Sequence, residues 1–314
     1  MKKRIIKFFL FVAIFFWLFK DINYHQLFIA LQNLQLQGIF LTTIMIFCTD
    51  LLIAYRWYYL SKHKFSYISS LEATMLAFFL NIFAPAKLGD LAKVYYMHKK
   101  DNIDPHYSSS IFFIERFFDV IVLTIIIAFS ALFIYPNFKT FLISIILFSF
   151  ILFVFFIIFY KKTFFVIIRF IKIKKVRKIF FLIVKAIREN LTKKRITITF
   201  LLTFLVWCCN YLNNIIFFFS ATTFQLHFID IFIASTLAFA ISAIPLTPGG
   251  IGTFQGAFIV ALGWYGISKE EALGASSILQ LLYILPATFY SLYLFFSKDF
   301  LWEKKDVSTQ DIQK

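Results

Sequence analysis

Long apolar runs separated by short polar and basic segments make up most of this chain. The runs cover residues 5–19, 38–60, 111–135, 140–160, 196–220 and 271–297. The runs from residue 38 onward are each close to the ~20 residues that a helix needs to cross the hydrocarbon core of a membrane. No small-x-small cleavage pattern follows the first run, so we expect it to stay as an uncleaved span. The pattern predicts six membrane-crossing helices.

Two further apolar segments, 71–97 and 231–265, are interrupted by proline and glycine. Their unbroken limbs have about 14 residues, which span only ~21 Å of a ~30 Å core. Backbone that leaves the helix at membrane depth persists only where protein buries it or where it lines a wet cavity. Each segment is therefore predicted to be a helical hairpin. Aligning Pro85 with Pro248 also aligns Gly89 with Gly252.

Basic flanks predict the orientation of these hairpins, because Lys and Arg gather on the cytoplasmic side. Residues 62–64 and 98–100 are basic and flank the first hairpin, whereas Asp230 and residues 269–271 flank the second. Both ends of the first hairpin are then cytoplasmic, and both ends of the second lie outside. The fold predicted is two inverted repeats, about 1–135 and 140–297, each with three transmembrane helices and one re-entrant helical hairpin. Eight full crossings are the alternative, which would leave one of two basic clusters outside.

Composition agrees with an all-α polytopic membrane protein that forms a single domain over residues 1–314. The chain is 61% apolar and 15% charged, with a net charge of +16. The positive charge flanks apolar runs, which favours anionic lipid and argues against nucleic acid as a partner. Residues 161–195 hold thirteen Lys or Arg and one acid. They are either amphipathic helices in the headgroup layer or a solvated cytoplasmic loop.

The hairpin breaks are candidates for binding an anion. Half-helices are expected to begin at about Leu88 and Thr253, with unpaired N–H groups and the positive ends of their dipoles at the breaks. Lys87 adds positive charge at the first break, and an anionic lipid headgroup is the predicted guest. Residues that let backbone approach a ligand at the second break are Pro248, Gly249, Gly250 and Gly252. Alternatively, these residues only kink the helices or allow close packing.

Charged residues inside apolar segments form a second set of candidates. Glu115, Arg116 and Asp119 open the run 111–135, and ionisable residues at such depth are functional candidates by default. Alternatively, Glu115 lies at the interface, since it is only about five residues, or ~8 Å, from Ser110.

Two further charged pairs were weighed. Asp90 and Lys93 follow the first break at positions i and i+3. They are either binding-site residues or an acid at the start of a helix with the lysine as its ion-pair partner. Asp50 and Arg56 are predicted to be structural, with Arg56 extending to the cytoplasmic face. The cysteines and histidines have no metal-ligand spacing, so we expect no metal, cofactor or catalytic residue.

Three segments, 85–93, 115–119 and 245–255, make the chain resemble the family built on the transmembrane domain of lysylphosphatidylglycerol synthetase, the flippase-like proteins. The resemblance implies a protein that moves a lipid or lipid-linked headgroup between leaflets. Lysyl transfer is not expected, because the soluble aminoacyl-transferase domain is absent. The expected substrate-binding residues are Lys87, Gly89, Asp90, Lys93, Glu115, Arg116, Asp119, Pro248, Gly249, Gly250, Gly252, Thr253, Gln255 and Gln280.

The chain departs from the family pattern at four of these positions. Gln255 and Gln280 stand where the family usually has an acid and an Arg. If the two face each other, an amide pair has replaced an ion pair. Asp90 and Lys93 stand where Glu and Arg are usual, which keeps the charge but loses the bidentate reach of Arg.

The predicted function is translocation of an anionic phospholipid or lipid-linked headgroup across the inner membrane of a bacterium, with both termini cytoplasmic. One alternative is a membrane enzyme or enzyme subunit that modifies a lipid headgroup, with Asp90, Glu115 and Asp119 as its polar cluster. A scaffold for envelope-lipid machinery is another, for which the basic stretch 161–195 is the hint. A homo-oligomer is left open.

Overall fold

The computed structural model describes residues 23–134, 192–244 and 246–297, with a few isolated residues in between. The side chains of residues 85–87 and 132–134 lie outside this description. So do the predicted spans 5–19 and 140–160, most of the basic stretch 161–195, and Pro245. The described part is all-helical and contains nine α-helices and two 3-10 turns.

Apart from α2, which no apolar run predicted, the described helices match the predicted runs and hairpin limbs, with differences at their ends. They are α2 (Tyr24–Gln32), α3 (Leu36–Leu60), α4 (Tyr67–Phe83), α5 (Leu91–Asp101), α6 (Pro105–Ile134), α10 (Lys193–Ser220), α11 (Phe228–Ala243), α12 (Thr253–Gly263) and α13 (Lys269–Ser297). Within the described residues, three helices are long and apolar enough to cross a membrane: Leu36–Leu60, Lys193–Ser220 and Lys269–Phe296.

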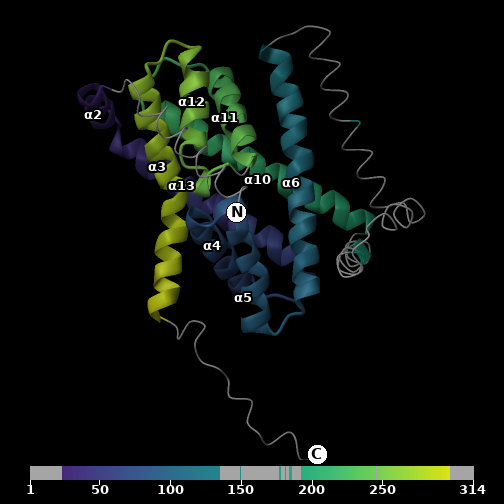
Figure 1. The fold of residues 1–314 in the computed structure, drawn as a ribbon. Coiled ribbons are helices and arrows are strands. Elements are labelled where there is room, and N and C mark those ends of the chain that lie inside the picture. The colour runs from purple at the N-terminus through teal and green to yellow at the C-terminus, as the bar shows by residue number, and fades with distance from the viewer. Residues whose placement is uncertain are drawn as a thin grey trace, which may run out of the picture.

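The proline and glycine breaks divide both short apolar segments into helix pairs. The 3-10 turn η1 (Pro85–Asp90) joins α4 to α5, and η2 (Pro248–Gly250) lies between α11 and α12. Proline opens both turns because it lacks the N–H that would continue the preceding helix. Figure 1 shows the two pairs in opposite halves of the molecule, with α6 and α13 along its sides. The turns η1 and η2 contact each other, so the two breaks meet.

Helices α3 and α10 form the central contact between the two halves of the chain. At one end a Cβ added to Gly38 would lie 2.1 Å from the carbonyl oxygen of Ser220. Beside it, Gln35 N donates to Ala221 O at 2.8 Å. Small residues of this kind let two helix backbones approach closely.

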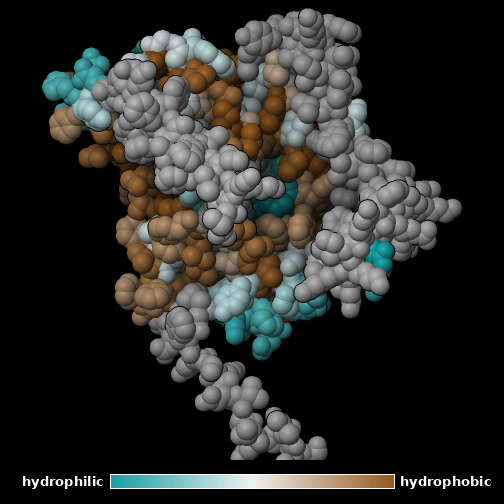
Figure 2. Space-filling view, in the orientation of Figure 1, coloured by the Kyte–Doolittle hydropathy of each residue, from teal (hydrophilic) through white to brown (hydrophobic). Residues whose placement is uncertain are grey.

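Apolar packing and surface both fit a protein that lies among lipids. One buried cluster centres on aromatic residues of α10 and α12, and a second centres on Trp57 and Phe118. Large apolar side chains also cover much of the outer surface, as Figure 2 shows in brown, and Phe296 is 81% exposed. Such a surface is unfavourable in water and expected against hydrocarbon.

Candidate functional site

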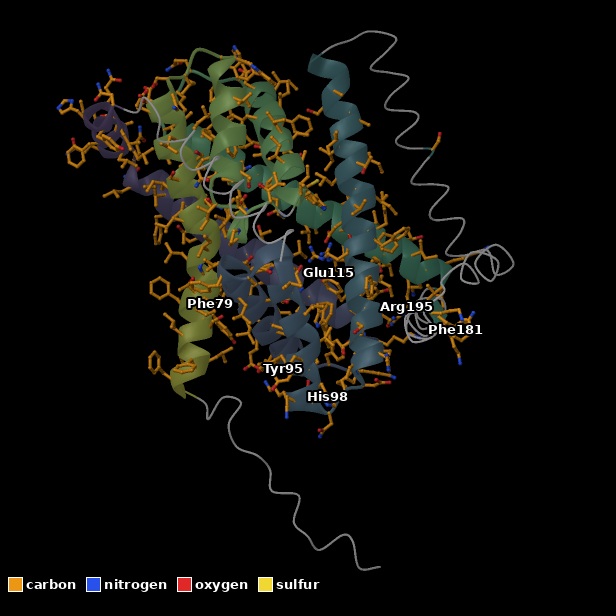
Figure 3. The ribbon with its side chains drawn as sticks, viewed as in Figure 1. Phe79, Tyr95, His98, Glu115, Phe181 and Arg195 are labelled. Carbon is orange, nitrogen blue, oxygen red and sulfur yellow. The ribbon has the colours of Figure 1, made fainter. Side chains whose placement is uncertain are left out.

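Glu115 of α6 lies at the centre of a group of buried charged side chains. Arg56 Nη2 of α3 lies 2.8 Å from Glu115 Oε1, and Lys93 Nζ of α5 lies 3.1 Å from Glu115 Oε2. Both Glu115 and Lys93 are fully buried, and Arg56 is 2% exposed. Figure 3 places Glu115 near mid-height, well above His98 at the lower end of α5. The carboxylate therefore joins three helices inside the protein.

Arg56 is a member of this group that the sequence reasoning misplaced. Besides Glu115, its guanidinium lies 2.6 Å from Asp119 Oδ1 and donates to Thr203 Oγ1 of α10 at 3.2 Å. The prediction that Arg56 extends to the cytoplasmic face is wrong, because the side chain points into the helix bundle. The signal was present: Arg56 is a charged residue inside a long apolar helix, and such residues face the bundle interior.

Lys93 and Asp90 do not pair with each other in the way that their spacing suggested. Lys93 pairs with Glu115 instead, and its Nζ lies 4.8 Å from the centre of the Trp57 ring, within cation–π range. Asp90 precedes α5 but makes no capping hydrogen bond, and its Oδ1 accepts from Asn81 Nδ2 at 2.7 Å. Asp90 therefore stands at the start of α5, as the helix-start alternative expected, but the ion pair with Lys93 that this alternative included is not formed.

Arg116 is held more loosely than the other two cations. Its guanidinium nitrogens lie 3.8 Å from Asp90 Oδ2, 3.6 Å from Glu115 Oε1 and 3.6 Å from Asp119 Oδ2, all beyond hydrogen-bonding distance. Its Nε has no hydrogen-bond partner, and the side chain is 34% exposed. Arg116 thus combines a full charge and long ion contacts with partial exposure of its side chain, while its Nε atom is itself buried, as is the unpartnered Nε of Arg56.

These six side chains have equal numbers of positive and negative charges. We call them the ion cluster: Arg56, Asp90, Lys93, Glu115, Arg116 and Asp119. Because the cations and carboxylates balance, the cluster carries no net charge when all six are ionised. A hydrophilic patch is set back between apolar side chains near the centre of the view in Figure 2, at the height where Figure 3 shows Glu115.

The first break packs its backbone tightly against α4. A Cβ on Gly89 would lie 2.5 Å from Asn81 N and 2.8 Å from Ala77 O, so only glycine fits there. This contact places the start of α5, and with it Asp90 and Lys93, beside the ion cluster. The side chain of Lys87 is outside the described residues, so its role stays a prediction.

The second break uses glycine for its backbone conformation. Gly249, Gly250 and Gly252 have φ values of 61°, 72° and 87°, a region that favours glycine. A Cβ on Gly249 would lie 3.3 Å from Ile82 Cα of α4, which shows how closely the two breaks meet. Pro248 opens the turn, and Thr253, at the start of α12, donates to Gly250 O at 2.9 Å.

Three backbone amides of the second break already have partners. Gly250 N donates to Thr247 O at 3.3 Å and Ile251 N donates to Pro248 O at 3.1 Å. Gly252 N donates to Gln255 Oε1 at 2.8 Å, so the side chain fills the place expected for an anion. The expectation of a row of unpaired amides from Gly249 to Thr253 is therefore not met at these three positions.

The amide pair expected at the second break is present. Gln255 Nε2 donates to Gln280 Oε1 at 2.5 Å, and Gln280 Nε2 donates to Gly249 O at 3.0 Å. Together with the bond from Gly252 to Gln255, these contacts tie η2 and α12 to α13. The second break is thus held by neutral groups. No group of three or more potential metal-ligating side chains occurs among the described residues.

Comparison with known proteins agrees with this architecture. Over 225 residues the chain is 27% identical to the UPF0104 membrane protein MJ1078 of Methanocaldococcus jannaschii. The aligned region covers 69% of this chain and 91% of that protein. The sequence also matches the family described as the lysylphosphatidylglycerol synthase TM region over residues 4–290. Because this match extends over nearly the whole chain, the protein belongs to the lysylphosphatidylglycerol synthase transmembrane-region family of multi-pass membrane proteins.

Proposed function

We propose that this protein moves an anionic phospholipid or a lipid-linked anionic headgroup between the leaflets of the membrane, and that Arg116 binds the headgroup. The observation that carries the proposal is the loose pairing of Arg116, whose ion contacts are 3.6 Å or longer and whose Nε has no partner. A phosphate would give this guanidinium short, bidentate, charge-assisted hydrogen bonds that its present partners do not give.

Releasing Arg116 would affect its carboxylate partners unequally. Asp119 keeps its 2.6 Å contact with Arg56, whereas Asp90 keeps a 2.7 Å hydrogen bond from the neutral amide of Asn81 and no ion contact among the described residues. Binding of a phosphate by Arg116 therefore means losing the Asp90 contact, which is already long at 3.8 Å. Lys93 and Arg56 stay with Glu115 and hold the cluster in place.

The packing of the two helix pairs supports inverted repeats with re-entrant hairpins. Helix α4 of the first pair packs against α13, and α11 of the second pair packs against α6. The helices α5 and α12 pack in turn against α6 and α13, while α3 and α10 pack on each other. Exchanging the two halves leaves this contact pattern unchanged. Rocking of one half against the other would expose Arg116 to each leaflet in turn.

Basic residues supply the proposed orientation. The lower end of α5 carries His98, Lys99 and Lys100, and Figure 1 shows the other helix pair directed toward the opposite end. With the basic end in the cytoplasm, we propose an inner-membrane protein with cytoplasmic termini. The membrane and an anionic lipid are the proposed partners.

Reconstitution in liposomes tests the proposal. We expect purified protein to accelerate leaflet exchange of a fluorescent phosphatidylglycerol, and Arg116→Gln to slow it about tenfold or more, since hydrogen bonds to a charged group contribute roughly 1.5–3 kcal/mol. Arg195→Gln is the matched control, because Arg195 lies apart from the ion cluster and contacts the Tyr59 ring.

The same assay separates the alternatives. Equal exchange rates in the Arg116 and Arg195 variants, with equal protein incorporated, would remove Arg116 as the headgroup site. A chemically altered lipid detected by mass spectrometry would support the enzyme instead. Absence of both exchange and product would contradict transport and support a scaffold.

A further inference from the structure

Asp50 is a buried carboxyl outside the ion cluster. It lies in α3, ten residues before Leu60 at the helix end, which corresponds to ~15 Å along the axis or about half of a ~30 Å hydrocarbon core. The residue is 6% exposed. An acidic side chain therefore sits near the middle of a helix that is long and apolar enough to span the membrane.

No partner satisfies this carboxyl. Among the described residues, Asp50 has no ion pair, and its buried Oδ2 has no hydrogen-bond partner. This contrasts with Glu115, which contacts two buried cations. An isolated ionised carboxylate in an apolar interior is strongly unfavourable, so such a group takes up a positive charge.

Polar side chains of α3, α10 and α13 have hydrogen-bond partners other than Asp50. Thr49 Oγ1 donates to Met45 O at 2.8 Å and accepts from Asn213 Nδ2 at 3.1 Å. From α13, the Tyr283 hydroxyl donates to Asn214 Oδ1 at 2.8 Å. No hydrogen bond among the described residues reaches Asp50 Oδ2.

The Tyr67 hydroxyl of α4 donates at 3.1 Å to the backbone oxygen of Leu51, the residue after Asp50. No Lys, Arg or His of the described residues lies within ion-pair distance of Asp50.

We propose that Asp50 is the carboxyl of an occluded monovalent-cation site near the middle of α3, separate from the ion cluster and filled by a proton or a sodium ion. One carboxylate balances one positive charge. Transporters hold coupling ions near the bilayer midplane in this way. Coupling of this cation to lipid movement rests on the proposed function, whereas occupancy of the site does not.

Occupancy is tested on the full chain in lipid nanodiscs. If the occupant is a proton, infrared spectra show the carbonyl stretch of a protonated carboxyl at neutral pH, and Asp50→Asn removes that band. If the occupant is sodium, the unfolding temperature of the native protein rises in sodium chloride relative to choline chloride, as expected for a ligand that binds the folded state. Asp50→Asn then abolishes the increase.

Asp104 is exposed, so Asp104→Asn is the matched control and is expected to keep both the infrared band and the sodium effect. A protein in which Asp50→Asn changes neither the infrared band nor the sodium effect has no cation at Asp50, and the inference is then wrong. Either positive result supports the site and identifies its occupant.

Coupling is tested in the liposome assay with an imposed gradient of the identified ion. A tenfold gradient, equal to about 1.4 kcal/mol, is expected to alter the exchange rate of the native protein and of Asp104→Asn. Asp50→Asn is expected to lose this response while still exchanging lipid. If the native protein moves no lipid, the proposed function fails, and the nanodisc result still decides whether Asp50 binds a cation. A retained response in Asp50→Asn removes coupling through this residue.

Discussion

The two hairpin breaks share a helical plan but differ in the chemistry that surrounds them. Beside the first break, the ion cluster joins α3, α5 and α6 through short contacts between full charges, such as Arg56 with Glu115 at 2.8 Å. At the second break, the Gln255–Gln280 pair joins α12 and α13 through neutral amides at 2.5 Å. Among the described residues, the first break therefore lies beside paired full charges, whereas the second is held by neutral groups.

The difference also predicts unequal sensitivity to substitution. Removing one member of a buried ion pair leaves an uncompensated charge and typically costs about 3–5 kcal/mol. Leaving a buried neutral group unsatisfied typically costs about 1–3 kcal/mol. Substitutions in the two regions should thus separate by size of effect.

The largest effect is expected from Glu115→Gln. This change removes the charge that Arg56 and Lys93 share, so both buried cations lose a partner, and the expected loss of stability is about 3–5 kcal/mol. Thermal unfolding in detergent measures it. Glu270→Gln is the matched control, because Gln keeps the oxygen that accepts from Asn23 N and no buried cation depends on Glu270. Similar unfolding temperatures for the two variants would contradict the central role of Glu115.

Glycine-to-alanine changes sharpen the comparison at the breaks themselves. Gly89→Ala drives a Cβ into backbone atoms of α4, and such overpacking costs about 1–3 kcal/mol. Gly250→Ala meets nothing closer than 3.8 Å but forces alanine into φ 72°, which costs roughly 1–2 kcal/mol.

Gly263→Ala is the control for both, since its Cβ has no neighbour within 4 Å. Unfolding temperatures are expected to fall in the order Gly263→Ala, Gly250→Ala, Gly89→Ala. A Gly89 variant as stable as the Gly263 variant would mean that the first break is not tightly packed.

The smallest effect is expected from restoring charge at the second break. Gln255→Glu alone places a carboxylate beside Gln280 without a cation, and Gln280→Arg alone places a cation there without an acid. The double variant pairs the two charges, so a double-mutant cycle of unfolding free energies should give a favourable coupling within the usual range of about 0.5–3 kcal/mol. Strict additivity of the two single changes would contradict the direct contact of these side chains.

Sequence reasoning located the helices and the breaks because apolar run length and proline positions are local signals. It also anticipated that Gln255 and Gln280 could face each other, from the family pattern. It could not find the pairing of Arg56 with Glu115 and Asp119, because helix rotation decides which face of α3 meets α6. It also missed that the Gln255 side chain accepts the hydrogen bond of Gly252 N. Whether a side chain or a ligand can reach this amide depends on the three-dimensional geometry of the turn.

Gly38 has a mechanical consequence for the central helices. Its missing Cβ brings the α3 backbone against the carbonyl of Ser220, and the hydrogen bond from Gln35 to Ala221 fastens the same end. Further along the same pair, Asn213 donates to Thr49 and Arg56 donates to Thr203. The close approach at Gly38 therefore fixes the axial register of α3 against α10, on which these later hydrogen bonds depend.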